Sequence, residues 1–259
     1  MVTHRELHAD IGDSLISKVP HVTLAFWIIK ILATTVGETG GDALSMTLRL
    51  GYAVSSAIFL AFFGVMLAIQ VASKRYHPFT YWAVVVATTT VGTTMSDYLD
   101  RTLDLGYVKS SIVLFCGVLV ILFVWRRAAG RIEFENITTK KEEVFYWMTI
   151  LVSNSLGTAL GDFVATTTDL GFERGALVFA GLLALVAAAH FLFGRIPPSL
   201  FFWAAYVLTR PLGATLGDTL TKSHEEGGLG QGRILSSLII AALMVIAIMM
   251  TAREKRDVI

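Results

Sequence analysis

The chain has 259 residues, of which 54% are hydrophobic and only 16% are charged, and its mean hydropathy is +0.66. A soluble domain carries about a quarter charged residues, so these values exclude a water-soluble protein. The net charge of +1 argues against a nucleic-acid-binding protein, which needs a concentrated Lys/Arg surface. Cys116 is the single cysteine, which excludes an intramolecular disulfide and a cysteine-ligated metal cluster.

The first segment, residues 1–19, is acidic and lacks an apolar centre, so we predict a cytoplasmic tail rather than a signal peptide. The rest of the chain predicts an all-α polytopic membrane protein with eight transmembrane helices, since about 20 apolar residues cross a bilayer. The predicted spans are 22–42, 52–72, 79–97, 107–125, 144–162, 174–194, 199–218 and 233–251.

One pattern recurs four times along these spans. A tryptophan is followed ten residues later by glycine, fifteen residues later by aspartate and twenty-four residues later by a second glycine. We number repeat positions from the tryptophan, so that the aspartates are at +15. The tryptophans are Trp27, Trp82, Trp147 and Trp203, and the aspartates are Asp42, Asp97, Asp162 and Asp218.

The repeats divide the chain into segments of two predicted spans each. Repeat three is delayed by a charged stretch, which we predict to be a cytoplasmic linker between the halves. The predicted boundaries are 20–73 for repeat 1, 74–125 for repeat 2, 126–143 for the linker, 144–195 for repeat 3, 196–251 for repeat 4 and 252–259 for a second cytoplasmic tail.

The distribution of Lys and Arg predicts the orientation. The tails and the loops between repeats hold thirteen of these residues, whereas the loops within repeats hold six. The positive-inside rule then places both termini in the cytoplasm. Because each repeat has two spans, all four repeats insert with the same polarity, and they are parallel repeats with pseudo-symmetry about the membrane normal.

Four tandem two-span units, each with a recurrent tryptophan, resemble a bacterial membrane-protein family known only as a tandem repeat of unknown function. The resemblance covers about residues 20–250. It implies a multi-pass protein of the bacterial inner membrane, and it implies no activity.

The first span of each repeat carries a polar stripe, because positions +8, +11 or +12, and +15 share one helical face. The second spans carry almost no such residues, so we predict that the first spans line the interior, with their carboxylates turned away from lipid. The predicted cation-binding residues are Asp42, Asp97, Asp162, Asp218, Glu38, Thr35, Thr39, Thr90, Thr94, Ser155, Thr158, Asn154, Arg210 and Thr215.

Within this set, the four aspartates and Glu38 are the predicted metal ligands. Hard oxygen ligands favour magnesium, manganese, calcium or a proton, and we expect no cofactor other than such a transported ion. The alternative is structural. Glycine at +10 and a small residue at +14 let helices approach closely, hydroxyls can bond the preceding turn, and the aspartates can cap the following loop.

Two basic residues within the predicted spans break the repeat. Position +7 is Thr34, Thr89, Asn154 and Arg210 in the four repeats. Arg210 is predicted either to pair with an aspartate or Glu38, or to compete with a transported cation or contact an anionic substrate. Lys30 is predicted to snorkel toward the cytoplasmic surface.

These features predict a membrane transporter for a small cation such as manganese or magnesium, with proton-coupled efflux as its mode, and not an enzyme, since no nucleophile and base pair is apparent. One alternative is a proton-coupled transporter of a small organic or anionic solute held by Arg210. The other is a membrane scaffold or sensor without transport. The predicted partners are the lipid bilayer and the cation, with no nucleic acid, and a homo-oligomer stays open.

Overall fold

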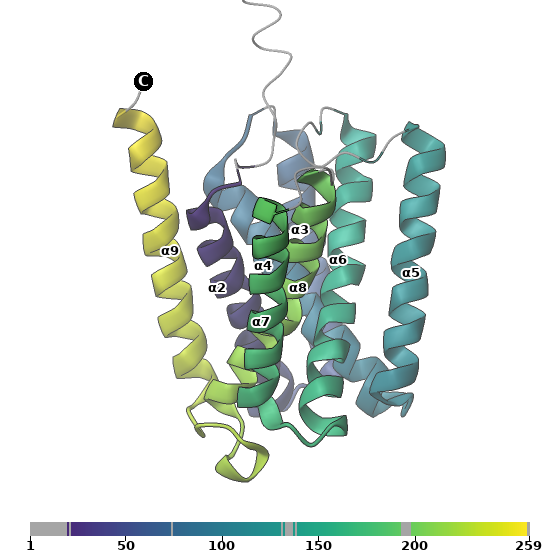
Figure 1. Cartoon of the computed structure of the whole chain (residues 1–259), viewed down its shortest axis with the longest axis vertical. Helices are drawn as coiled ribbons and strands as arrows, with labels where there is room; N and C mark the ends of the chain where they lie inside the picture. The colour runs from purple at the N-terminus through teal and green to yellow at the C-terminus, as the bar shows by residue number, and fades with distance from the viewer. Residues whose placement is uncertain are drawn as a thin grey trace, which may run out of the picture.

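The computed structural model describes residues 20, 22–73, 75–130, 132, 137, 139–192 and 198–257. The predicted tail 1–19 lies outside these residues. The described chain forms eight long helices that run up and down in one bundle (Figure 1). They are α2 (Leu24–Asp42), α3 (Gly51–Ala72), α4 (Pro78–Asp97), α5 (Gly106–Ala129), α6 (Lys140–Asp162), α7 (Gly171–Leu192), α8 (Pro198–Thr221) and α9 (Arg233–Asp257).

The first helices of the four repeats form a closed inner ring. In this ring α2 contacts α4, α4 contacts α6, α6 contacts α8, and α8 contacts α2. Each second helix packs outside the first helix of the next repeat: α3 on α4, α5 on α6, α7 on α8, and α9 back on α2. This cyclic order confirms the prediction of four parallel two-helix repeats whose first helices line the interior.

The outer helices are the most apolar. Among the described residues, α3, α5, α7 and α9, together with α6 and its extension to Thr167, are long and apolar enough to cross a membrane. The inner helices α2, α4 and α8 fall below that limit, because they carry many buried polar side chains. Those side chains face protein rather than lipid, so the inner helices are shielded by the outer ones.

The second repeat glycine lies in the turn between the paired helices of repeats one to three. Helices α2, α4 and α6 each continue into a π-helical turn, at Ala43–Thr47, Tyr98–Thr102 and Phe163–Thr167. Each following outer helix then starts at a glycine with positive φ, which costs little because glycine has no Cβ.

Repeat four has a different turn. Helix α8 is followed by a 3₁₀ turn at His224–Glu226, which Ser223 begins as an N-cap. The Ser223 hydroxyl donates to the Glu226 carboxylate at 2.8 Å and lowers the pKa of that group. This loop lies at the end of the bundle opposite the start of α2 and the end of α9 (Figure 1).

The predicted linker 126–143 is shorter than expected. Helix α5 continues to Ala129 and ends at Gly130, whose φ is +76°, and α6 begins at Lys140. Thr139 and Glu142 form a capping box there, with reciprocal side-chain and backbone hydrogen bonds. The prediction placed the helix ends where charged residues begin, but charge alone does not end a helix that extends into water.

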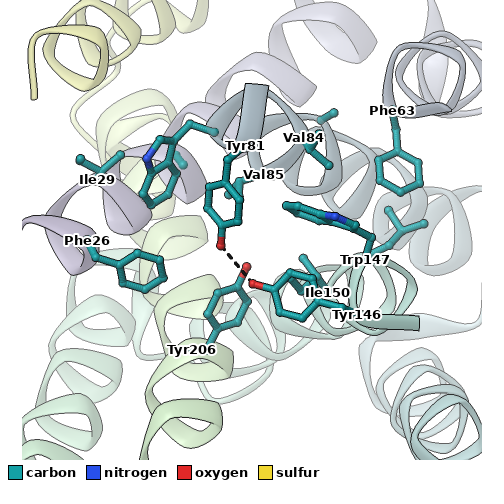
Figure 2. Close-up of a cluster of buried hydrophobic side chains, with 14 of the residues drawn as sticks. Phe26, Ile29, Phe63, Tyr81, Val84, Val85, Tyr146, Trp147, Ile150 and Tyr206 are labelled. Carbon is teal, nitrogen blue, oxygen red and sulfur yellow. Dashed lines mark hydrogen bonds between the residues drawn. The ribbon is translucent and has the colours of Figure 1, made fainter. Parts of the chain in front are cut away.

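An aromatic layer closes the axis at the tryptophan end of the bundle. The hydroxyls of Tyr81, Tyr146 and Tyr206 converge there, and those of Tyr81 and Tyr146 are 3.0 Å apart (Figure 2). Trp82 and Trp147 are buried between helices and do not face lipid. The inner position of α4 and α6 explains this, since outer helices cover them.

Candidate functional site

Repeat glycines at +10 bring the inner helices into close contact. A Cβ on Gly37 would overlap with Thr89, one on Gly213 with Thr34, and one on Gly157 with the Arg210 side chain. Each glycine therefore faces position +7 of the next repeat around the ring. The structure therefore confirms the prediction that glycine at +10 lets neighbouring helices approach closely.

Position +7 also links neighbouring inner helices by hydrogen bonds. In repeats one to three, its side chain donates to position +6 of the previous repeat around the ring. The bonds are Thr34 Oγ1 to the Thr209 carbonyl at 3.2 Å, Thr89 Oγ1 to the Ala33 carbonyl at 3.2 Å, and Asn154 Nδ2 to Thr88 Oγ1 at 3.0 Å.

The other predicted hydroxyl ligands each donate to a carbonyl of their own helix, as in the structural alternative. Such a hydroxyl still has oxygen lone pairs with which to accept. The acceptors are Ile31 for Thr35 (2.9 Å), Val36 for Thr39 (3.5 Å), Val86 for Thr90 (3.1 Å), Thr90 for Thr94 (3.2 Å), Leu151 for Ser155 (3.3 Å), Asn154 for Thr158 (3.4 Å) and Pro211 for Thr215 (2.9 Å).

Arg210 takes a different direction from the other +7 residues and reaches the axis of the ring. Its Nη2 lies 3.0 Å from Glu38 Oε2, 2.7 Å from Thr93 Oγ1 and 2.5 Å from Thr158 Oγ1. All three partners are at +11, one from each of the other repeats. The predicted ion pair is confirmed, and Glu38 rather than an aspartate is the carboxylate.

The four aspartates are buried as predicted, but they do not form an open ring of carboxylates. Arg101 bridges Asp97 (3.2 Å) and Asp162 (3.5 Å). Lys222 bridges Asp218 (3.3 Å) and Asp42 (3.1 Å), and Arg233 of α9 adds a second cation to Asp42 at 3.4 Å. Each aspartate is therefore ion-paired in this structure.

Sequence reasoning missed these bridging cations. Arg101 and Lys222 are both at +19, four residues after the aspartates of repeats two and four. That spacing puts them on the aspartate face of a helix, whereas the predicted spans end at the aspartates and leave both residues in loops. The helical structure continues past the aspartates, and this places the two cations beside them.

The snorkelling prediction for Lys30 is wrong. The side chain is fully buried, with 0% exposure, and Nζ lies 4.2 Å from the centre of the Tyr206 ring. Nζ has no hydrogen-bond partner. Position +3 faces the axis one turn before +7, so the lysine lies inside the ring and cannot reach the surface.

Three of the five predicted metal ligands come together. One carboxylate oxygen each from Glu38, Asp42 and Asp218 lies within 4.8 Å of the others, and all three residues are buried. Glu38 and Asp42 lie on α2, and Asp218 lies on α8. We call this set the α2–α8 carboxylate cluster. Asp97 and Asp162 lie outside it, on α4 and α6.

Comparison with protein families shows four matches to one model, described as a Repeat of Unknown Function (DUF347), at residues 25–76, 80–131, 145–195 and 201–257. These segments cover most of the chain and coincide with the four two-helix units. Comparisons with curated proteins and with solved structures gave no match.

Proposed function

Because the chain belongs to the Repeat of Unknown Function (DUF347) family, whose description names no activity, we propose a function from the axial site alone. The protein is a membrane transporter for a small cation, and the α2–α8 carboxylate cluster binds that cation. The supporting observation is the convergence of three buried carboxylates within 4.8 Å inside a helical membrane bundle. Ionisable groups at such depth are costly and mark ion pathways.

Lys222 gives this site an exchange mechanism. Its ammonium group lies 3.1 Å from Asp42 and 3.3 Å from Asp218, which is where a cation bound to the cluster would also contact those carboxylates. A cation entering the site then displaces the ammonium group, and the lysine returns when the cation leaves. The carboxylates keep a positive partner throughout, so neither state leaves them uncompensated.

The ligand set favours a hard ion. Carboxylate and hydroxyl oxygens without thiolate suit magnesium, manganese or calcium, and protons can occupy the same carboxylates. We propose a divalent cation exchanged for protons, with manganese or magnesium as the first ions to test.

The proposed orientation follows from the positive loops. The start of α2 and the end of α9 lie at the same end of the bundle (Figure 1). In the sequence, the tails and the loops between repeats hold thirteen of the Lys and Arg residues, so we place both termini in the cytoplasm of a bacterial cell and the protein in its inner membrane.

The test compares aspartates at the same repeat position. Asp42→Asn and Asp218→Asn each remove a charge from the carboxylate cluster, whereas Asp97→Asn removes an equally buried charge outside it. We expect at least a tenfold loss of manganese affinity or flux for the first two variants in purified protein and proteoliposomes, and a much smaller loss for the control. Equal effects of all three changes, or no manganese binding by the unaltered protein, would contradict the proposal.

Lys222→Met tests the exchange step. Removing a competing internal cation should tighten manganese binding while slowing its release. A static ion pair predicts only lower stability, with unchanged affinity.

A scaffold without transport is the second candidate. It is favoured by the ring of glycine contacts and by hydroxyls that bond their own helices. This candidate predicts that each Asp→Asn change lowers folded yield and that none alters cation binding in the protein that folds.

A further inference from the structure

Two buried cations on the axis have hydrogen-bond donors without acceptors. Lys30 Nζ has no partner, and neither do Nε and Nη1 of Arg210. Both side chains are fully buried, with 0% exposure. Leaving such donors unpaired costs far more for a charged group than for a neutral one.

These two residues lack enough negative charge around them. Lys30 Nζ lies against the ring of Tyr206, which is one helical turn before Arg210 on α8, so the two basic side chains lie in adjacent layers. Glu38 pairs with Arg210 through Nη2, whereas Nε and Nη1 of Arg210 have no hydrogen-bond partner. Across the four repeats, position +3 is Lys30, Val85, Ile150 and Tyr206, and position +7 is Thr34, Thr89, Asn154 and Arg210, so neither layer holds a carboxylate.

The neutral groups that face these layers do not supply the missing hydrogen-bond acceptors. The hydroxyls of Thr34 and Thr89 donate to backbone carbonyls, and the Asn154 amide donates to Thr88. The Tyr206 ring face lies against Lys30, which gives the ammonium a weak electrostatic partner, and the Tyr206 hydroxyl is buried without a hydrogen bond. The layers therefore present several donors and an excess of positive charge.

We propose that Lys30 and Arg210 bind one small inorganic anion of the chloride class on the axis of the ring. The anion accepts from Lys30 Nζ and from Nη1 of Arg210, because the Nε–H points to another edge of the guanidinium. Val85 and Ile150, at +3 on the neighbouring inner helices, are fully buried, so an ion held in this layer is shielded from water. This site is distinct from the carboxylate cluster, since Glu38 contacts Nη2 rather than Nη1, and it does not depend on the proposed cation transport.

The first experiment uses the unaltered protein, purified without manganese or magnesium. The melting temperature is measured while chloride replaces gluconate at constant ionic strength. A specific site gives a saturable rise of about 3–6 °C at ten times the dissociation constant. Bromide soaked into crystals should give an anomalous scattering peak between Lys30 and Arg210.

Variants separate this site from general salt effects. Lys30→Met keeps the length of the side chain and removes its charge, so the chloride-dependent rise should disappear. Lys109→Met, on the exposed surface of α5, is the matched control and should keep it. If Lys30→Met does not fold, the bromide position in the unaltered protein decides.

Two results would overturn the proposal. One is a melting temperature that depends on ionic strength but not on the replacement of gluconate by chloride. The other is a chloride response that persists in Lys30→Met. A water molecule, or a neutral Lys30, would then satisfy the buried donors instead.

Discussion

Removing Arg210 should destabilise the bundle strongly, and a second change at Glu38 should restore much of the loss. Arg210→Gln keeps the Cβ and Cγ atoms that pack against Gly157, so the close helix contact survives. It removes the guanidinium that joins Glu38, Thr93 and Thr158 across three helices. Glu38 then remains as a buried carboxylate without its cation.

The size of the effect follows from this burial. Arg210 is fully buried and Glu38 is 3% exposed, so solvent screens the pair weakly. Breaking such a pair from one side costs about 3–5 kcal/mol, which corresponds to a fall in melting temperature of about 10 °C for a chain of this length. In Glu38→Gln/Arg210→Gln no charge is left uncompensated, so we expect an interaction energy of about 2–3 kcal/mol.

Thermal unfolding of the two single variants and the double variant measures this interaction. The matched control is Asp162→Asn combined with Arg210→Gln, because Asp162 is paired with Arg101 instead. That control should be no more stable than Arg210→Gln alone. The reasoning would be refuted if the loss of stability in Glu38→Gln/Arg210→Gln equalled the sum of the losses in the two single variants within about 0.5 kcal/mol. Independent sites add in that way.

Two further predictions concern the bundle itself. Cysteines at Lys140 and Ser223 in a Cys116→Ala background should react with impermeant reagents from opposite sides of the membrane, and labelling from one side only would contradict the orientation. Gly213→Ala should lower stability by about 1–3 kcal/mol, because the added Cβ overlaps with the adjacent helix. Gly64→Ala, which has no other atom within 4 Å of the added Cβ, should leave the melting temperature equal or higher, and a similar loss in both variants would argue against tight inner packing.

The residues that recur in the four repeats were enough to predict the eight helices and the face of each first helix that points into the bundle. Asp42 and its three counterparts are buried, as their shared face with the hydroxyls predicted. Lys30 was predicted wrongly, because a lysine one turn from Trp27 is equally consistent with snorkelling to the surface, although +3 lies on the buried face too. A buried lysine without an acceptor is rare, and only the packing of α8 against α2 shows that Tyr206 covers it.

The pairing of charges between repeats could not be predicted from the sequence. Spacing places Arg101 beside Asp97 and Lys222 beside Asp218, but it does not tell which neighbouring repeat each cation also reaches. That depends on the order of the helices around the ring. The structure places α6 next to α4 and α2 next to α8, and these contacts bring Asp162 to Arg101 and Asp42 to Lys222.

The departures from repeat symmetry concentrate between α2 and α8, where the end of the repeat array meets its beginning. Lys30 and Glu38 come from α2 and Arg210 comes from α8, and no other repeat has a charged residue at +3, +7 or +11. Asp97, Asp162 and Arg101 form a simpler triad between α4 and α6, so the same kind of bridge exists there without these additional charges. A bridge needed only for packing would be the same at both places. The extra charges therefore make the α2–α8 contact the place where ion binding should be sought, with the α4–α6 contact as its internal control.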